Sequence, residues 1–345
     1  MARDSQPART LIDAAAAGTT AADVPSSAPK PVDRRQRRFR LRPDETVPDG
    51  IRRVARGQLA GAGDDFAGVR TAELGEAVHS ARKRVKRVRA TLRLAREAIG
   101  DAAYQRENTH MRMAAGRLSA ARDARVLLDT LGALEKRFED ELAPAATARL
   151  RARLEDGHDR ALAAMAEEGD VAGTTLQALE EARARTAQWT FERDGFDALR
   201  PGLRRIYRRG RKRLRAACAD PSVENLHDYR KRVKDLWHAA QLLRPAHPKR
   251  MKRLSRRAHE LANLLGDDHD LSVLRDYIEV HPQLFEDAAA RDALLALLDR
   301  RRDALRRRAL KLGRRLYKRS PKRFVRSIER GWHKRAGRRG KPVAG

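Results

Sequence analysis

The sequence predicts an all-α protein, and three features support that fold class. Ala, Leu and Arg, which favour helices, dominate the composition, whereas aromatic residues make up only 4% of the chain. Runs of Val, Ile, Tyr and Phe, which favour strands, are almost absent. From Ile51 onward the apolar residues recur with helical spacing. Because 41% of the 345 residues are hydrophobic, the chain can bury a sizeable core.

The segments follow from breaks in this helical spacing. Residues 1–38 are expected to form a flexible leader, because prolines stand there among Ala, Ser, Thr and Asp without a sustained period. Further breaks divide the rest into helices of ordinary length and lie near Gly61–Gly63, Gly100, Pro144, Gly169–Gly173, Gly195, Pro201, Asp220 and Pro245–Pro248. We expect a helical domain over 39–336, with halves of about 51–190 and 196–336, and a disordered basic tail over 337–345.

One helix start is predicted in detail. Asp220 is expected to cap the next helix, and Pro221 to occupy its first position, where the missing N–H of proline costs nothing.

Near the C-terminus, residues 300–341 carry 20 Lys and Arg but only two acids. Apolar residues still recur in that stretch, so we expect a helix there that frays past Gly337.

The charge of the chain indicates its class of partner. The sequence has 77 Lys and Arg against 47 Asp and Glu, a formal net charge of +30. Such a balance attracts nucleic acid, phosphate polymers or acidic membrane surfaces.

Cys218 is the only cysteine, which excludes an intramolecular disulfide and a multi-cysteine metal site. The single cysteine suits a reducing interior, and no run of 18 apolar residues occurs, so we expect a cytoplasmic protein without membrane insertion. We also expect no cofactor and no metal.

An internal repeat is the most informative pattern. The segments His79–Lys86 and His227–Lys234 agree at six of eight positions, at an offset of 148 residues. Further along, Leu118–Leu127 matches Leu265–Leu274 at an offset of 147. Two matches with nearly the same offset predict a duplicated helical unit.

Helical geometry divides each repeated segment into two faces, since successive residues lie about 100° apart. One face is a basic stripe, formed in the two copies by His79, Arg82, Lys83 and Lys86, and by His227, Arg230, Lys231 and Lys234. The opposite face is apolar and is expected in the core: Val78, Ala81, Val85, Val88 and Leu92 in the first copy, and Leu226, Tyr229, Val233, Leu236 and Ala240 in the second. Like charges at this spacing repel one another, which favours an anionic ligand.

At these residues the sequence resembles the CHAD domain family. The resemblance covers about residues 39–335 and includes the lead-in Phe39–Val47. It implies two helical bundles related by a pseudo-twofold axis, with a basic groove or pore that binds inorganic polyphosphate, in the cytoplasm and at polyphosphate granules. The implied ligand contacts are His79, Arg82, Lys83, Lys86, Arg122, His227, Arg230, Lys231, Lys234 and His269. Secondary candidates, basic in both copies, are Arg106, His110, Arg253 and Arg257.

Two other functions remain open from the sequence. The charge also suits an architectural protein that contacts nucleic acid nonspecifically through phosphates, although stacking aromatics are scarce. Asp267–Asp270 could be mistaken for a phosphohydrolase site, but the first copy offers no matching second histidine, so we expect no catalytic residues. Purely structural roles are the alternatives: His79 and His227 cap or pack, and Asp123 and Asp270 form a salt bridge or a helix-end contact beside a Val-Leu core pair. His238 is expected to be a surface or packing residue.

Overall fold

Helices carry nearly all of the chain that the computed structural model describes, which comprises residues 37–66, 74–116, 120–167 and 171–337. These residues contain no β-strand, so the all-α prediction is confirmed. The expected leader, 1–38, and the expected tail, 337–345, lie almost entirely outside the described residues. None of the described helices is both long and apolar enough to span a bilayer.

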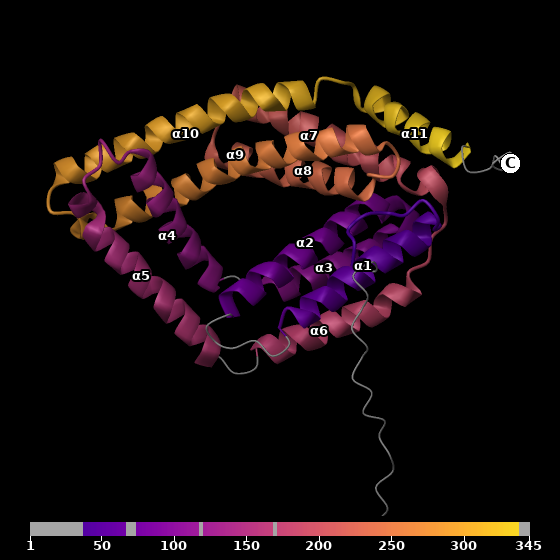
Figure 1. Ribbon diagram of the computed structural model, residues 1–345, viewed down its shortest axis with the longest axis horizontal. Helices are drawn as coiled ribbons and strands as arrows, with labels where there is room; N and C mark the ends of the chain where they lie inside the picture. Colours follow the sequence, from indigo (N-terminus) through magenta and orange to yellow (C-terminus); the bar gives the residue numbers. More distant parts are fainter. Residues whose placement is uncertain (1–36, 67–73, 117–119, 168–170, 338–345) are drawn as a thin grey trace, which may run out of the picture. The chain divides into compact units, whose positions relative to one another are not determined.

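The first bundle consists of four helices from the N-terminal half. Its members are α1 (Val47–Asp64), α2 (Leu74–Ile99), α3 (Asp101–Gly116) and α6 (Val171–Arg185). Helix α1 packs against α2 and α6, and α3 packs against α2 and α6, as Figure 1 shows. Helix α2, which carries the first repeated segment, thus lies between α1 and α3, and α6 closes the bundle against these two.

The second bundle is built from the C-terminal helices. It contains α7 (Arg200–Ala219), α8 (Val223–Leu242), α9 (Pro248–Val280), α10 (Ala288–Leu316) and α11 (Pro321–Gly337). Helix α8 packs between α7 and α9, α10 packs on α9 and α7, and α11 packs on α7. The two bundles meet where α2 contacts α7 and α8. Helical bundles are therefore present, while their relation by a twofold axis stays a prediction.

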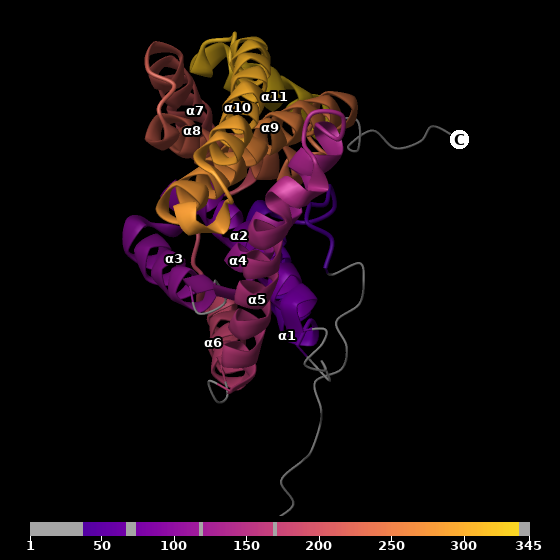
Figure 2. The ribbon, with the colours of Figure 1, turned by 90° about the vertical axis from the view of Figure 1, so that its left-hand side faces the viewer.

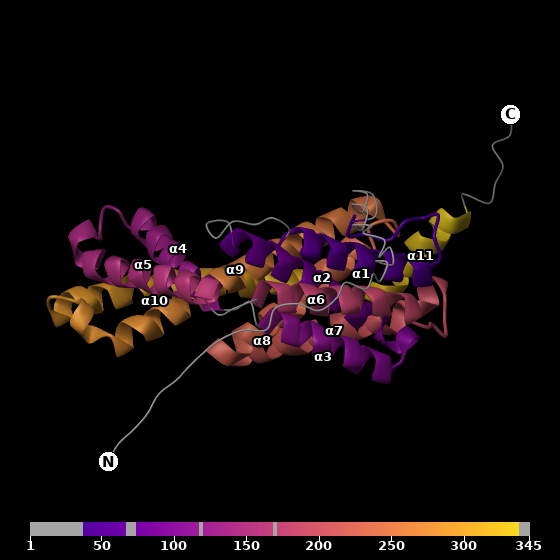
Figure 3. The same ribbon diagram turned by 90° about the horizontal axis from the view of Figure 1, so that it is seen from below.

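A helical hairpin, formed by α4 (Ala120–Arg137) and α5 (Pro144–Glu167), links the two bundles in a different place. Helix α4 packs on α9 and also contacts α2 (Figures 2 and 3). Arg300 of α10 pairs with Glu141 at 2.5 Å and lies over the ring of Phe138 at 4.6 Å, close to the turn of the hairpin. The hairpin is thus held against the second bundle.

The predicted core faces of the repeated segments are confirmed. Every residue assigned to the apolar stripe of α2 is at most 1% exposed, and those of α8 are at most 2% exposed. The bundles also approach closely at Gly202 of α7, where a β-carbon would collide with the backbone carbonyl of Leu94 in α2. Since both apolar stripes face inward, the basic stripes must lie on the other sides of α2 and α8.

The predicted start of the helix after Asp220 is wrong by two residues. Helix α8 begins at Val223, with Ser222 at the cap position in an extended conformation. Asp220 instead accepts hydrogen bonds from the Ser222 N–H at 3.2 Å and from Asn225 Nδ2 at 2.8 Å. The carboxylate therefore organises the turn before the helix, and Pro221 lies within that turn.

Candidate anion-binding cavity

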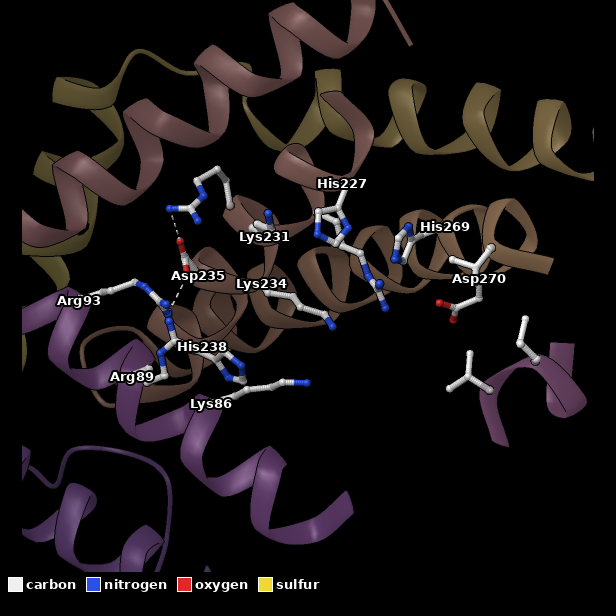
Figure 4. Close-up of a pocket in the computed structure, with 15 residues that line it drawn as sticks. Lys86, Arg89, Arg93, His227, Lys231, Lys234, Asp235, His238, His269 and Asp270 are labelled. Atoms are coloured by element: carbon white, nitrogen blue, oxygen red, sulfur yellow. Dashed lines mark ion pairs between the residues drawn. The ribbon is translucent and has the colours of Figure 1, made fainter. Parts of the chain in front are cut away.

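A cavity of about 580 Å³ lies where α2, α4, α8 and α9 meet. The described residues of its lining include seven Lys and Arg side chains and three histidines, but only two carboxylates. Figure 4 shows cationic side chains of α2 and α8 extending toward the same open space. The lining residues are Lys86, Arg89, Arg93, Val126, Leu127, His227, Arg230, Lys231, Arg232, Lys234, Asp235, His238, His269, Asp270 and Val273.

Helix α2 supplies one cationic wall. Lys86, Arg89 and Arg93 follow one another at intervals of three and four residues, so their side chains share one face of the helix. Arg89 donates a hydrogen bond from Nε to the side-chain oxygen of Asn108 in α3, at 3.1 Å. Burial and the charge of Arg93 lower the pKa of Arg89 from its ordinary value of 12.5. Arg89 is therefore held in place by α3, and its positive charge is repelled by that of Arg93.

Helix α8 supplies the opposing wall, and α9 makes room for it. The buried apolar face of α8 turns His227, Arg230, Lys231 and Lys234 away from the core. Arg230 passes close to Gly266 of α9, where a β-carbon would lie 2.9 Å from Nη2 of the guanidinium. Glycine at this position thus permits α8 and α9 to pack closely while Arg230 reaches the cavity.

Asp235 joins the two walls. Its side chain is only 8% exposed and pairs with Arg93 of α2 at 3.3 Å and with Arg232 of α8 at 3.0 Å, as the dashed lines in Figure 4 mark. A single buried carboxylate therefore holds two guanidinium groups that repel one another. Asp235 and Asp270 are the only acids among the described residues of the lining, and the Lys and Arg of that set outnumber them by five.

Two histidines face one another inside the cavity. The ring centroids of His227 and His269 lie 4.5 Å apart. Burial, followed by the charge of Lys231, lowers the pKa of His227 to about 4, and burial together with Arg230 lowers that of His269. Nδ1 of each ring is buried without a hydrogen-bond partner among the described residues. The ring of His227 is therefore neutral at pH 7, and a bound anion would raise the pKa values of both rings.

The remaining side of the cavity is aliphatic. Val126 and Leu127 of α4 and Val273 of α9 line it, and Val273 is 41% exposed although it is apolar. The expectation of a Val-Leu core pair is therefore wrong for Val273, whose neighbour Leu274 alone is buried. In the first copy, Val126 and Leu127 are both half-buried at the cavity.

Six of the ten sequence-predicted contact residues line the cavity: Lys86, His227, Arg230, Lys231, Lys234 and His269. His79, Arg82 and Lys83 lie on earlier turns of α2 and are not among the lining residues. Arg122 belongs to α4, but its side chain lies outside the described residues.

None of the four secondary candidates lines the cavity. Arg106 of α3 is exposed and pairs with Glu107 at 3.1 Å. His110 contacts Arg185 Nη2 at 3.2 Å. Arg253 and Arg257 are exposed on α9.

Sequence reasoning missed several lining residues that continue the predicted stripes. Arg89 and Arg93 extend the spacing of Lys86 along α2, and His238 lies four residues beyond Lys234 on α8. The repeated segments end at Lys86 and Lys234, but continuing the helical spacing beyond them would have identified Arg89, Arg93 and His238. His238 also packs as expected: it stacks on Trp237 at 4.7 Å and meets the edge of Phe39 at 5.6 Å.

Comparison with known proteins yields one family. The family model described as the CHAD domain matches residues 53–279, which include all the residues that line the cavity. No curated protein sequence matches the chain.

Proposed function

The chain belongs to the CHAD domain family, and from this membership and the basic cavity we propose that it binds inorganic polyphosphate. The observation that carries the proposal is the excess of cations over carboxylates in one cavity, between helices whose other faces are buried. Polyphosphate is a linear polyanion without bases, so only charge, hydrogen-bond donors and shape can recognise it.

The lining offers each kind of donor that phosphate oxygens accept. Arg230 carries a planar guanidinium, the shape that suits paired hydrogen bonds to phosphate, and Lys231 and Lys234 add ammonium charges, that of Lys231 lying 3.3 Å from Asp228. His227 donates from its neutral ring or, once a phosphate raises its pKa, from an imidazolium. Because folding has already brought these groups together, a ligand relieves their repulsion when it binds.

The size and lining of the cavity favour a thin phosphate chain over nucleic acid. A volume of about 580 Å³ is typical of a pocket for a small ligand, so a duplex could contact only the rim. None of the described residues that line this cavity is a Phe, Tyr or Trp, whereas proteins that bind single strands stack bases on aromatic rings.

A binding role without catalysis is part of the proposal. The carboxylates of Asp267–Asp270 do not converge: Asp268 is buried and pairs with Arg302 and Arg306 of α10, while Asp270 lines the cavity. Asp267 is exposed. A hydrolytic site would need such groups directed at one reacting atom.

The test is titration of the full chain with polyphosphate of defined length, in excess DNA and at fixed salt. Lys231→Glu with Lys234→Glu should weaken polyphosphate binding about a hundredfold, because repulsion replaces two contacts. Lys212→Glu with Arg215→Glu changes the charge equally on the exposed face of α7, outside the cavity lining, and should have little effect.

Circular dichroism establishes that each variant is folded, and Lys231→Gln with Lys234→Gln serves if the reversal unfolds the chain. Equal losses in the cavity and control variants, or displacement of polyphosphate by DNA, would remove the proposal. Binding would bring the protein to polyphosphate granules in cells that store the polymer, which co-localisation of a fluorescent fusion would measure.

A further inference from the structure

A short non-helical segment before α1 bends at Phe39 and Arg40, where the Arg40 N–H donates to the carbonyl of Arg38 at 2.8 Å. In the sequence Arg38-Phe39-Arg40-Leu41-Arg42, basic and apolar residues alternate. Leu41 is 1% exposed, whereas Arg38 and Arg40 are exposed, so this segment anchors an apolar side chain and leaves two arginines at the surface.

The segment is fixed to the second bundle and to α1. The Leu41 N–H donates to the carbonyl of Leu242 at 3.0 Å, at the end of α8. Arg53 of α1 donates from Nη2 to the carbonyl of Arg40 at 2.8 Å. Phe39 lies under the guanidinium of Arg87, at 5.4 Å. The positions of the outward arginines are therefore set by the fold.

Three adjoining surface hollows meet at Arg40, and together they form what we call the outer groove. The first, of about 190 Å³, is lined by Phe39, Arg87, Arg244 and Lys252 as well as Arg40. The second, of about 330 Å³, shares Arg40 and Arg244 and reaches Arg335 of α11. The third, of about 370 Å³, extends to Arg38.

The outer groove carries an excess of positive charge. Arg40, Arg244 and Lys252 are exposed and make no ion pair with a described residue. The nearby acids are Asp44, which lines the third hollow, and Glu45, whose carboxylate pairs with Arg53 at 2.7 Å. A row of cations with so little compensation is suited to a second stretch of polyanion.

The outer groove also adjoins the cavity. Phe39, which lines the first hollow, contacts His238, which lines the cavity. Lys86 of the cavity and Arg87 of the groove are neighbours on α2. These side chains lie at the boundary between the cavity and the outer groove. A phosphate chain that fills the cavity and extends past them therefore reaches further cations.

We propose that the outer groove is a second phosphate-chain site, which engages the part of a long polyphosphate that extends beyond the cavity. This inference rests on the proposed function. It implies that long chains bind more tightly and cover more phosphates per protein than chains confined to the cavity. The same groove would contribute nothing to the binding of a chain too short to reach it.

The test uses the triple variant Arg40→Glu, Arg244→Glu, Lys252→Glu of the full chain. Its matched control is Arg307→Glu, Lys311→Glu, Arg314→Glu on the exposed face of α10, which changes the charge equally. Titrations with tripolyphosphate and with long-chain polyphosphate give affinity, site size and salt dependence. The corresponding triple Gln variant replaces either protein that fails to fold.

For the groove variant we expect unchanged tripolyphosphate affinity and a loss of about tenfold for the long chain. The slope of log K against log salt should fall by about 2, since each phosphate contact on a flexible single strand contributes about 0.7. The number of phosphates covered per protein should also fall. The control should retain all three values.

Several results would overturn the inference alone. One is a groove variant that binds long polyphosphate as the control does. Another is a groove variant that loses only single-stranded DNA, which would assign the groove to nucleic acid. Failure of the unmodified chain to bind either polyphosphate would instead refute the proposed function itself.

Discussion

Replacing Asp235 by Asn should weaken the fold and strengthen polyphosphate binding in the same protein. The substitution preserves the shape of the side chain but removes the charge that pairs with Arg93 and Arg232, whose side chains are 22% and 16% exposed. Two largely buried guanidinium groups then lose their anion. Breaking a buried pair in this way costs about 3 kcal/mol, which corresponds to a fall in Tm of about 5 °C for a chain of this size.

The affinity should change in the opposite direction. Asp235 lines the cavity, so its neutralisation removes a charge that repels phosphate. At a dielectric constant between those of water and a protein interior, removing the repulsion between the Asp235 carboxylate and a bound phosphate should raise the affinity about fivefold. Urea unfolding followed by circular dichroism measures the first effect, and calorimetric titration with polyphosphate measures the second.

Two matched aspartates separate these effects. Asp268→Asn removes an equally buried carboxylate that pairs with Arg302 and Arg306 but does not line the cavity, so stability should fall without a gain in affinity. Asp156→Asn removes an exposed carboxylate from two pairs and should change neither property by much. The reasoning would be refuted if Asp235→Asn matched Asp156→Asn in unfolding, or if it bound polyphosphate more weakly.

Three further outcomes follow from protonation and packing. Because the pKa of His227 is about 4 in the free protein, a bound polyanion should raise it; binding should then take up protons and tighten as the pH falls from about 7 to 5. Calorimetry in buffers of different ionisation enthalpy measures this uptake, and His227→Phe should reduce it. Burial holds the pKa of His238 at about 3, below its ordinary 6.5, so the stabilising contribution of the neutral ring is complete above pH 6.5 and declines as the pH falls toward 3. At pH 5 the loss is about 2 kcal/mol, and His238→Gln should lack this slope in urea titrations; equal slopes would contradict the assignment. Gly202→Ala should cost about 2 kcal/mol, because its β-carbon meets the Leu94 carbonyl, whereas Gly157→Ala on α5 has open space and should stabilise the helix by about 0.5 kcal/mol; denaturant unfolding distinguishes the two.

The sequence predicted the fold class and the orientation of the repeated helices correctly. The helical period of the sequence was enough to assign Val85 and Val233 to the buried face and not to the basic face, because successive side chains of a helix are turned by a fixed angle. The same argument placed Lys86 and Lys234 on the faces that now line the cavity. Information that is local in the chain was sufficient for these predictions.

Contacts between distant helices could not be predicted in this way. Which turns of a basic stripe face the cavity depends on where α2 crosses α8, so Arg93 lies in the site and His79 does not. The pairing of Asp235 with Arg93 joins residues far apart in the chain and leaves no periodic signal. Asp220 was predicted to cap α8 because it precedes Pro221. It instead accepts hydrogen bonds within the turn before the helix, and Ser222 occupies the cap position.

The aliphatic side of the cavity affects how strongly the cations act. Water cannot hydrogen-bond to Val126, Leu127 or Val273, so a phosphate chain bound beside them has fewer solvent dipoles between itself and the lysines and arginines. The effective dielectric constant there is lower than at an open surface, and each attraction is correspondingly larger. Mobile ions also penetrate such a space less readily, so chains within the cavity should tolerate added salt better than chains along the outer groove. The aliphatic side chains of the cavity would thereby help to set the range of ionic strength over which the protein binds a phosphate chain.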